Sequence, residues 1–187
     1  MSSYYYLISS LSTPILGEKP QLTLGKFMNA CSDWVSESEY QELENVSLIP
    51  DFEKTSKNSV VNQWKNWETC LKNRIAVIRA GNLNKEAANY TLEEKDFFSE
   101  IERGVQEAFS AASPMAKEKM LDELRWTELD SLESGHQFDL SILCIYKLRL
   151  MLCEKWLNRE VENGEKNLDT VLLKFYTPEK NEEEEEL

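Results

Sequence analysis

Apolar side chains recur at steps of three and four residues through the stretch 139–163, which contains neither Gly nor Pro. This spacing is the period of an α-helix. A second apolar row lies on roughly the opposite side of the first half of the stretch. The first row is Leu143, Tyr146, Leu150, Cys153, Leu157 and Val161, and the second is Leu140, Cys144, Leu148 and Leu152. Two rows predict a central helix that other helices cover on two sides.

The ends of this helix are also marked in the sequence. Asp139 can accept hydrogen bonds from the first free amides. Lys155 and Arg159 lie near the predicted C-terminus, where the helix dipole is negative, and Gly164 can adopt the left-handed conformation that ends a helix. The helix is therefore predicted to end near Asn163.

A second amphipathic helix is predicted over 59–80, with Gly81 ending it. Its apolar positions also advance by three and four residues. They are Val60, Trp64, Trp67, Leu71, Ile75 and Ile78. Two tryptophans one turn apart predict a broad contact with another helix.

Capping patterns predict four further helices. Thr23 begins one, and the pair Ser36 and Glu39 begins a short one that reaches Asn45. Thr91 with Glu94 is predicted to open a helix that carries an apolar side, formed by Phe97, Ile101, Val105, Ala108 and Phe109. Ser113 caps the next helix, and Pro114 fits its first turn. The short connection 134–138 predicts that this helix and the central one are antiparallel neighbours.

The two ends of the chain have less regular patterns. The run Tyr4–Ile8 favours a strand by propensity, but no second convincing strand exists to pair with it. Residues 1–20 are therefore predicted to form an extended or single-turn segment packed on helices. The apolar positions in 168–175 fit one last helix, and an extended conformation stays open as an alternative.

The predicted fold is all-α, a bundle of about six to seven helices with a short extended N-terminal segment. We expect one helical domain over residues 1–178, because 187 residues with 41% apolar side chains can close one core of ordinary size. Residues 179–187 are predicted to be a disordered acidic tail, since they have almost nothing apolar to offset the entropy of ordering.

The formal charge of −13 changes the picture of possible partners. It argues against a face that follows nucleic acid phosphates or anionic lipid. The run Glu182–Glu186 contributes five of these charges, so the rest of the chain is acidic as well. A basic partner surface is the natural complement, although plain solubility also explains the charge. No segment has the length and apolarity to span a bilayer and no signal peptide pattern is seen, which predicts a cytoplasmic location without membrane insertion.

The residues that could carry chemistry form few patterns. Glu133 and His136 make an E-x-x-H pair of the type that holds metals in helical bundles. However, His136 is the only histidine, and Gly135 interrupts the helix between the two. A histidine hydrogen-bonded at a helix junction is the favoured alternative.

The remaining chemical motifs are missing as well. The glycines are scattered singly, so no phosphate-binding loop is present, and there is no C-x-x-C pair. The four cysteines lie in apolar helical patterns and are predicted to be reduced core thiols, at Cys31, Cys70, Cys144 and Cys153. We predict no catalytic, cofactor or metal site and no enzymatic activity.

Three arginines stand out because they interrupt apolar surroundings. Arg74 and Arg79 lie in the helix of the two tryptophans, and Arg125 directly precedes Trp126. An arginine in such a place either pairs with a carboxylate between helices or is reserved for a partner. The sequence leaves both possibilities open.

Four blocks of sequence follow one another along the chain, and together they span residues 5–140. They are Tyr-Tyr-Leu-Ile-Ser-Ser-Leu at Tyr5–Leu11, the Trp-Glu-x-x-Leu-Lys-Asn-Arg pattern in Trp67–Ala80, Leu-Asp-x-Leu-Arg-Trp in Leu121–Asp130, and Gly-His-x-Phe-Asp-Leu at Gly135–Leu140. Together they resemble an uncharacterised bacterial family whose members are typically encoded beside the subunits of a V-type ATP synthase.

Two helices carry a further resemblance, through Leu71, Asn73, Arg74, Arg79 and Gly81 in one and Tyr146, Lys147 and Arg149 in the other. These residues are distantly similar to the C subunit of V-type ATPases, which is named d in eukaryotes. That protein is an all-helical socket that joins the rotating central stalk to the membrane ring. The socket protein has three related lobes and is longer than this chain. One or more lobes would therefore be missing or reduced here.

The resemblance implies a function without catalysis. It implies an accessory or rotor-coupling component that links or assembles the catalytic head and the membrane sector of a V-type ATP synthase. The partners would be proteins of the central stalk or membrane ring, at the cytoplasmic side of the inner membrane. Arg74, Arg79, Tyr146 and Arg149 would lie on or near the partner surface. The alternative is a free-standing acidic helical adaptor that binds a basic protein.

Overall fold

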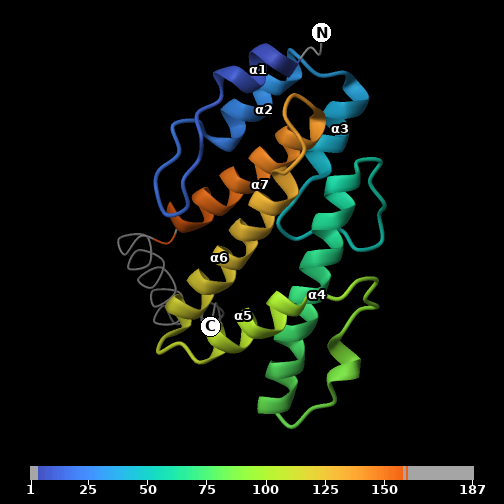
Figure 1. The fold of residues 1–187 in the computed structure, drawn as a ribbon, viewed down its shortest axis with the longest axis vertical. Helices are drawn as coiled ribbons and strands as arrows, with labels where there is room; N and C mark the ends of the chain where they lie inside the picture. Colours follow the sequence, from blue (N-terminus) through green and yellow to red (C-terminus); the bar gives the residue numbers. More distant parts are fainter. Residues whose placement is uncertain (1–3, 158, 160–187) are drawn as a thin grey trace, which may run out of the picture.

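The computed structural model describes residues 4–157 and 159. This part of the chain contains seven α-helices, one short 3-10 helix and no strand (Figure 1). The elements are α1 (Tyr4–Ser10), α2 (Leu24–Ser32), α3 (Glu37–Asn45), α4 (Ser59–Asn82), η1 (Ala87–Tyr90), α5 (Ser99–Phe109), α6 (Pro114–Glu133) and α7 (Leu140–Leu157). The predicted all-α bundle is confirmed.

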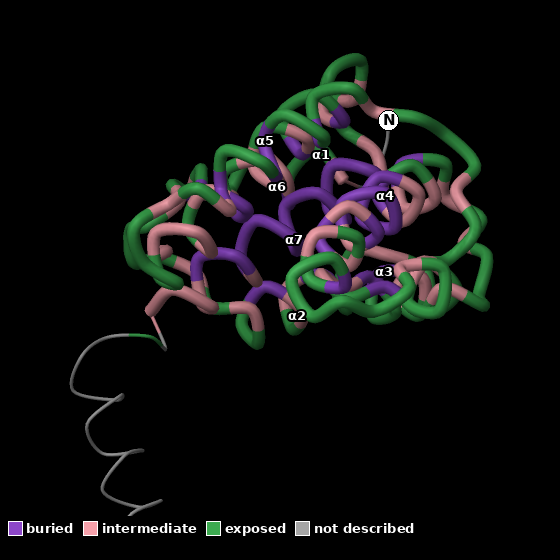
Figure 2. Tube along the Cα trace, turned by 90° about the horizontal axis from the view of Figure 1, so that it is seen from below, coloured by how far each residue is buried: buried purple, intermediate pink, exposed green. Residues whose placement is uncertain are grey.

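Helix α7 lies at the centre of the molecule. It packs against α1, α2, α3, α4 and α6, and every residue from Ser141 to Leu150 is buried. Figure 2 shows this burial as an almost unbroken stretch of α7 surrounded by other helices. Both predicted apolar rows contribute, since Leu143 and Leu148, from opposite rows, are each at most 1% exposed. The prediction of a central helix covered on two sides is confirmed.

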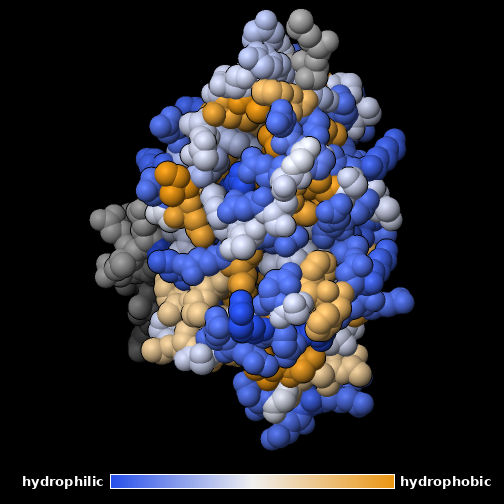
Figure 3. Space-filling model, in the orientation of Figure 1, coloured by the Kyte–Doolittle hydropathy of each residue, from blue (hydrophilic) through white to orange (hydrophobic). Residues whose placement is uncertain are grey.

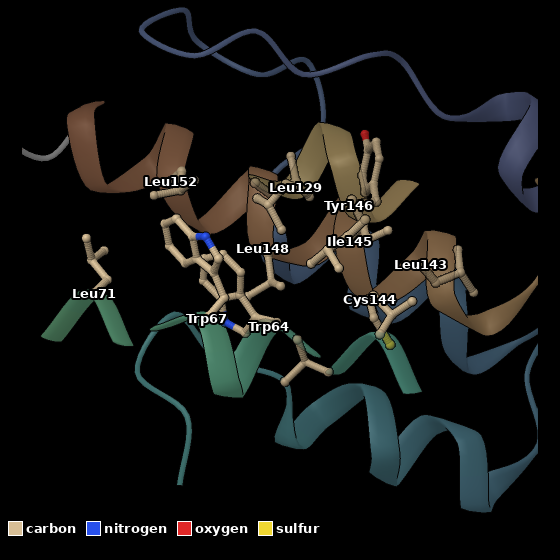
Figure 4. Packing of buried hydrophobic residues seen from close by; sticks show 14 of the residues in the cluster. Trp64, Trp67, Leu71, Leu129, Leu143, Cys144, Ile145, Tyr146, Leu148 and Leu152 are labelled. Carbon is tan, nitrogen blue, oxygen red and sulfur yellow. The ribbon is translucent and has the colours of Figure 1, made fainter. Parts of the chain in front are cut away.

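The two tryptophans of α4 pack into the core on the side that faces α7. Their rings stack with centroids 5.7 Å apart and an interplanar angle of 18°, and both are 1% exposed. In Figure 4, Trp64 and Trp67 project from α4 toward Leu148 and Leu152 of α7. The Trp64 indole Nε1 donates to the carbonyl of Ser47 at 3.2 Å. The two rings thus pack α4 against the central helix, and the hydrogen bond ties α4 to the segment that follows α3.

Helices α6 and α7 lie side by side and antiparallel, as the short connection between them predicts (Figure 1). Gly135 turns the chain there with a φ of +88°, a conformation that side chains other than glycine rarely adopt. Helix α5 packs across both α4 and α6. At its crossing with α6, a Cβ on Gly104 would lie 2.6 Å from both methyl groups of Leu124. Gly104 therefore permits close helix packing.

Four predicted helix starts are confirmed by their hydrogen bonds. The Ser113 side chain accepts from the Ala116 amide at 3.1 Å at the start of α6. The Thr23 side chain accepts from the Lys26 amide, and Ser36 and Glu39 form the predicted capping box. Asp139 Oδ1 accepts from the amide of Ile142 at 3.1 Å. These caps satisfy amides that have no partner within the helix.

The N-terminal prediction was wrong for residues 4–10. This segment forms the helix α1 and is not extended or limited to a single turn. Leu7 of α1 is 3% exposed in the core, and the Tyr4 hydroxyl donates to Glu39 of α3. Tertiary packing on α7 and α3 thus overrides the β-propensity of the tyrosines.

The predicted helix start at Thr91 and Glu94 was also wrong, because α5 begins only at Ser99. Glu94 accepts hydrogen bonds from Asn73 and Arg74 of α4 instead of closing a capping box. Asn73 also exchanges two hydrogen bonds with the backbone of Leu92, at 2.8 and 2.9 Å. These contacts hold the segment before α5 as a loop on α4.

Several predictions concern residues outside the described part of the chain. They are the apolar stripe in 168–175 and the acidic tail 179–187. The predicted end of the central helix near Asn163 was wrong, because α7 ends at Leu157 and Arg159 lies in a turn, where its amide donates to the carbonyl of Trp156 at 3.1 Å. Among the helices that the structure describes, none has both the length and the apolarity required to cross a membrane.

Candidate functional site

The structure does not bring the four predicted partner-binding residues together. Arg74 and Arg79 lie on α4, whereas Tyr146 and Arg149 lie on α7. Only Arg79 is exposed. Tyr146 is 7% and Arg149 is 8% exposed, and the Tyr146 hydroxyl donates to the carbonyl of Ser12 at 2.9 Å. Tyr146 therefore anchors the loop between α1 and α2 onto the central helix.

Arg149 of α7 connects this helix to its neighbour α6. Its Nη2 atom donates to Asp130 and Glu133 of α6, each at 2.6 Å. The guanidinium also lies 5.6 Å from the ring centroid of Trp126. Arg149 thus holds α7 to α6 by two charged hydrogen bonds and a cation–π contact.

Arg74 has a similar internal role on α4. It forms ion pairs with Glu94 at 3.0 Å and with Glu102 of α5 at 3.1 Å. The side chain is 24% exposed. Arg74 therefore fixes α5 and the loop before it onto α4, at the edge of the protein.

Arg125 of α6 lies at the centre of a buried charge network. Its Nε and Nη2 atoms donate to the two carboxylate oxygens of Glu68 at 3.0 and 2.9 Å, and its Nη1 donates to Asp122 at 2.7 Å. Glu68 and Asp122 are at most 1% exposed. Burial alone would lower the pKa of Arg125, but the two carboxylates raise it well above its ordinary value. The network therefore keeps the Arg125 guanidinium charged inside the fold.

The same network continues from α6 to α7. Lys155 of α7 pairs with Asp122 and with Glu118, each at 2.7 Å. The indole Nε1 of Trp156 donates to Asp122 at 3.0 Å. Three helices are thus joined through one fully buried carboxylate, because Glu68 of α4 reaches it through Arg125.

A pocket of about 490 Å³ opens on the outer side of this network, between the second half of α4, the segment 83–90 and α6. Its apolar wall is formed by Ile75, Ala76, Ala80, Leu83 and Leu121, and its polar groups are Lys72, Arg79, Lys85, Tyr90, Glu118 and Arg125. In Figure 3, a hydrophobic patch lies over the lower end of the molecule, where α4 ends, within a largely hydrophilic face. The pocket combines an apolar wall with several cations.

Some of the charged side chains that line this pocket form ion pairs with described residues, and others do not. Arg125 and Glu118 are each paired within the network. Among the described residues, no carboxylate lies within ion-pair distance of Lys72, Arg79 or Lys85. The Lys72 ammonium lies 4.8 Å from the ring centroid of Phe52 instead. The pocket is therefore locally positive in a chain with a formal charge of −13.

Burial lowers the pKa of Lys72, and the neighbouring Arg125 guanidinium contributes to the decrease while Glu68 opposes it. The lysine ammonium thus loses part of its hydration and lies close to another cation. A negative group in the pocket would favour its charged form.

Sequence reasoning singled out Arg79 but missed this pocket. Lys72 and Arg79 are seven residues apart and share one face of α4, which is a readable signal. The contribution of Lys85 and Tyr90 depends on how the chain turns back after α4. Asn84 makes that turn with a positive φ of 53°, and no pattern in the sequence specifies where the returning segment packs.

Four exposed aromatic rings line up at the other end of the molecule, and we call them the aromatic row. The Tyr5 ring lies 5.5 Å from Tyr6 and 4.8 Å from Phe138, and Tyr6 lies 6.3 Å from Trp34, between centroids. Their exposed fractions range from 39% at Phe138 to 71% at Tyr6. Figure 1 places α1 and the α6–α7 turn at the end opposite the C-terminus of α4. The aromatic row and the basic pocket are therefore separate surfaces.

The histidine and the cysteines, whose side chains are common in catalytic sites, have structural contacts or are buried in this fold. His136 Nδ1 lies 2.6 Å from Asp139 Oδ2, as expected for a histidine at a helix junction. Burial raises the pKa of the Cys31 and Cys144 thiols to about 12, which keeps them protonated and weakly nucleophilic. No group of three or more metal-ligating side chains is found in the described residues.

Comparison with known proteins gives one result. No curated protein and no solved structure matches the chain. A family model described as "Protein of unknown function (DUF2764)" matches residues 77–175, from the second half of α4 through α7 and beyond. This range is more than half of the 187 residues, and the chain belongs to this family.

Proposed function

We propose that this protein is a non-catalytic accessory or rotor-coupling component of a V-type ATP synthase, similar to its all-helical socket protein. It would link or assemble the catalytic head and the membrane sector from the cytoplasmic side. The resemblance of the four sequence blocks motivates this proposal. The fold is compatible with it, since the described part of this chain is also all-helical.

A coupling component must transmit force without unfolding locally. The buried network of Glu68, Arg125 and Asp122 joins α4 and α6, and Lys155 extends it to α7. Arg149 adds a second connection between α6 and α7. Because removing one member of a buried charge network is costly, these contacts oppose the separation of the three helices. The interior thus supports a mechanical role.

The observation that carries the proposal is the aromatic row. Tyr and Trp are enriched among the residues that dominate binding energy at protein interfaces, and contiguous exposed apolar surface marks interaction sites. Asp33, which directly precedes Trp34, is exposed, and the chain has a formal charge of −13. Cationic side chains bind both carboxylates and aromatic faces. The row therefore fits a basic segment of a partner protein.

In this proposal the aromatic row takes the partner-binding role that the sequence predicted for four other residues. Tyr146, Arg149 and Arg74 hold the fold together through contacts with Ser12, α6 and α5. Arg79 is exposed and open to a ligand, but it lines the pocket at the opposite end. In this proposal the aromatic row contacts the V-type ATP synthase.

The proposal is tested by purifying the tagged protein from its own cells with mild detergent and identifying the retained proteins by mass spectrometry. V-type subunits should be retained with the wild-type chain. Replacing Tyr6 and Trp34 together by serine should reduce their recovery at least tenfold, which corresponds to about 1.4 kcal/mol. Phe97→Ser is the matched control, because Phe97 is 71% exposed and lies outside the row.

Two outcomes count against the proposal. Recovery of no V-type subunit above the level of an untagged strain contradicts it. Recovery of a different basic protein that is lost in the row variant supports the second candidate, a free-standing acidic adaptor, which the formal charge of −13 also favours.

A further inference from the structure

We propose that the pocket between α4 and α6 binds a small organic anion, with its apolar body against Ile75 and Leu121 and its anionic group near Arg79 and Lys85. This inference does not depend on the proposed role in a V-type ATP synthase. It concerns the opposite end of the molecule from the aromatic row.

The shape of the pocket fits a small molecule. Its volume of about 490 Å³ lies within the range of roughly 300–1,000 Å³ that is usual for ligand pockets. Three separate segments form its walls, so a ligand is contacted from several sides. The apolar residues on α4 and α6 offer a surface that gains from burying carbon atoms.

The charged groups of the pocket fit an anion. Arg79 presents a guanidinium, which can bind a carboxylate or phosphate through two parallel hydrogen bonds. Lys85 follows on the returning segment and adds an ammonium. Neither has a carboxylate within ion-pair distance among the described residues. Both cations are therefore available to a ligand.

The negative groups nearby do not compete for these cations. Glu118, the one carboxylate among the described lining residues, is paired with Lys155 at 2.7 Å. Asp122 and Glu68 lie behind the pocket wall and are held by Arg125. The network thus neutralises the back of the pocket and leaves an excess of positive charge at its open side. Like charges brought together repel, and an anion relieves that repulsion.

The arrangement favours a small ligand over an acidic segment of a protein. The cations come from α4, the returning segment and α6, and they surround a concavity of limited volume. A protein segment would need a longer track of cations, whereas a compact anion meets Arg79 and Lys85 together. The ligand class is therefore an apolar or aromatic body with one carboxylate, sulfonate or phosphate end.

The test uses 1-anilinonaphthalene-8-sulfonate, which carries an aromatic body and one sulfonate and fluoresces when its body is buried. Titration of the native protein should show saturable binding at one site. The matched ligand is N-phenyl-1-naphthylamine, which has the same aromatic body without the sulfonate. It should bind at least tenfold more weakly, because it makes no charged hydrogen bond.

Protein variants then locate the site. Arg79→Gln and Lys85→Gln should each weaken sulfonate binding about tenfold. Ala76→Trp keeps every charge but fills the pocket, and it should abolish binding. Arg103→Gln and Lys26→Gln are the matched controls, since both side chains are exposed and lie outside the pocket. Circular dichroism confirms that each variant is folded.

The inference is overturned by unchanged sulfonate affinity in both Arg79→Gln and Lys85→Gln, by equal binding of the neutral amine, or by no saturable binding at all. A competition experiment distinguishes a small anionic ligand from an acidic segment of a protein. Displacement of the probe by 1-naphthyl phosphate supports a small ligand. Displacement by a hexaglutamate peptide and not by 1-naphthyl phosphate assigns the pocket to an acidic protein segment and also overturns the inference.

Discussion

Arg125 and Arg79 line the same pocket, but they lie in opposite electrostatic surroundings. Arg125 is held by two buried carboxylates, Glu68 and Asp122, at distances of 2.7 to 3.0 Å. Arg79 is exposed, and no described carboxylate lies within ion-pair distance of it. The first arginine belongs to the closed network behind the pocket, and the second belongs to the open side.

This difference separates structural charges from charges that are free to bind. A buried guanidinium without its carboxylates would cost several kcal/mol, so Arg125 and its partners must be kept together for the fold. An exposed guanidinium costs the fold little. Substitutions on the two sides should therefore act on different quantities, which are the free energy of unfolding for Arg125 and ligand affinity for Arg79.

The largest effect is expected for Arg125→Ala. It leaves the carboxylates of Glu68 and Asp122 buried, and Lys155 alone remains close to one of them. The free energy of unfolding should fall by roughly 3–5 kcal/mol, measured by urea denaturation. Arg79→Ala is the comparison variant and should change the same quantity by less than about 0.5 kcal/mol. If both variants lost the same free energy of unfolding, the distinction between the structural role of Arg125 and the binding role of Arg79 would be contradicted.

Arg149→Ala should have an intermediate effect of about 2 kcal/mol on the free energy of unfolding. Its partners Asp130 and Glu133 are 56% and 41% exposed, so water solvates them when the arginine is removed. Arg149→Lys should recover only part of the stability, because lysine does not reproduce the planar contact with Trp126. A fully stable Arg149→Ala that no longer retains V-type subunits would show that Arg149 serves a partner after all.

Gly104→Ala should destabilise the protein by about 1 kcal/mol. Alanine gains helix propensity, but its Cβ meets both methyl groups of Leu124 at 2.6 Å, and that overlap costs more. Combining it with Leu124→Ala should remove the overlap penalty, seen as a favourable coupling in a double-mutant cycle. Gly25→Ala in α2 is the matched control. Its Cβ meets nothing within 4 Å, and it should stabilise by about 0.5–1 kcal/mol.

The smallest effect is a pH-dependent gain at Glu128→Gln. Burial, with a smaller contribution from the charge of Glu100, raises the pKa of Glu128 to about 7. The unfolded chain loses this proton near pH 4.5 and the folded protein only near pH 7, so stability falls as pH rises through this interval. Linkage between these two pKa values alone would give about 3 kcal/mol. Because Glu128 is only partly buried, screening by water reduces the expected gain of the variant to about 1 kcal/mol at pH 8 relative to pH 4. Equal thermal shifts of the variant at both pH values would contradict the raised pKa.

The central helix was predictable because one pattern determines both its existence and its environment. Two apolar rows on one helix require covering elements on two sides, and α7 has them. The cap at Asp139 and the turn at Gly135 are local signals, and both are found as predicted. Local chemistry and burial agree in this region.

The errors occur where a distant contact decides the local structure. Thr91 and Glu94 have the spacing of a capping box, but Asn73 and Arg74, about twenty residues away, bind Glu94 and hold the loop. The tyrosines of α1 have β-propensity, but α1 packs its Leu7 into the core. Such long-range partners cannot be read from spacing within one segment.

The binding surfaces were predictable only in part. Arg79 was predicted to lie on or near a surface that meets a protein partner, and the structure shows that it is exposed and lines the pocket. The aromatic row was not predicted, because Tyr6, Trp34 and Phe138 come from three separate parts of the chain. The net charge of −13 also gave no indication of the excess of cations in the pocket, because a net charge does not tell where in the fold each charged residue lies.

Photo-crosslinking in living cells tests the proposed function most directly. A photoreactive amino acid placed at Trp34, in the aromatic row, should form a covalent product with a V-type subunit upon illumination. The same amino acid at Val77, which is 41% exposed on α4, should form none. The contradicting result is a Trp34 variant that is folded and illuminated yet crosslinks to no V-type subunit, or one that crosslinks no better than the Val77 variant.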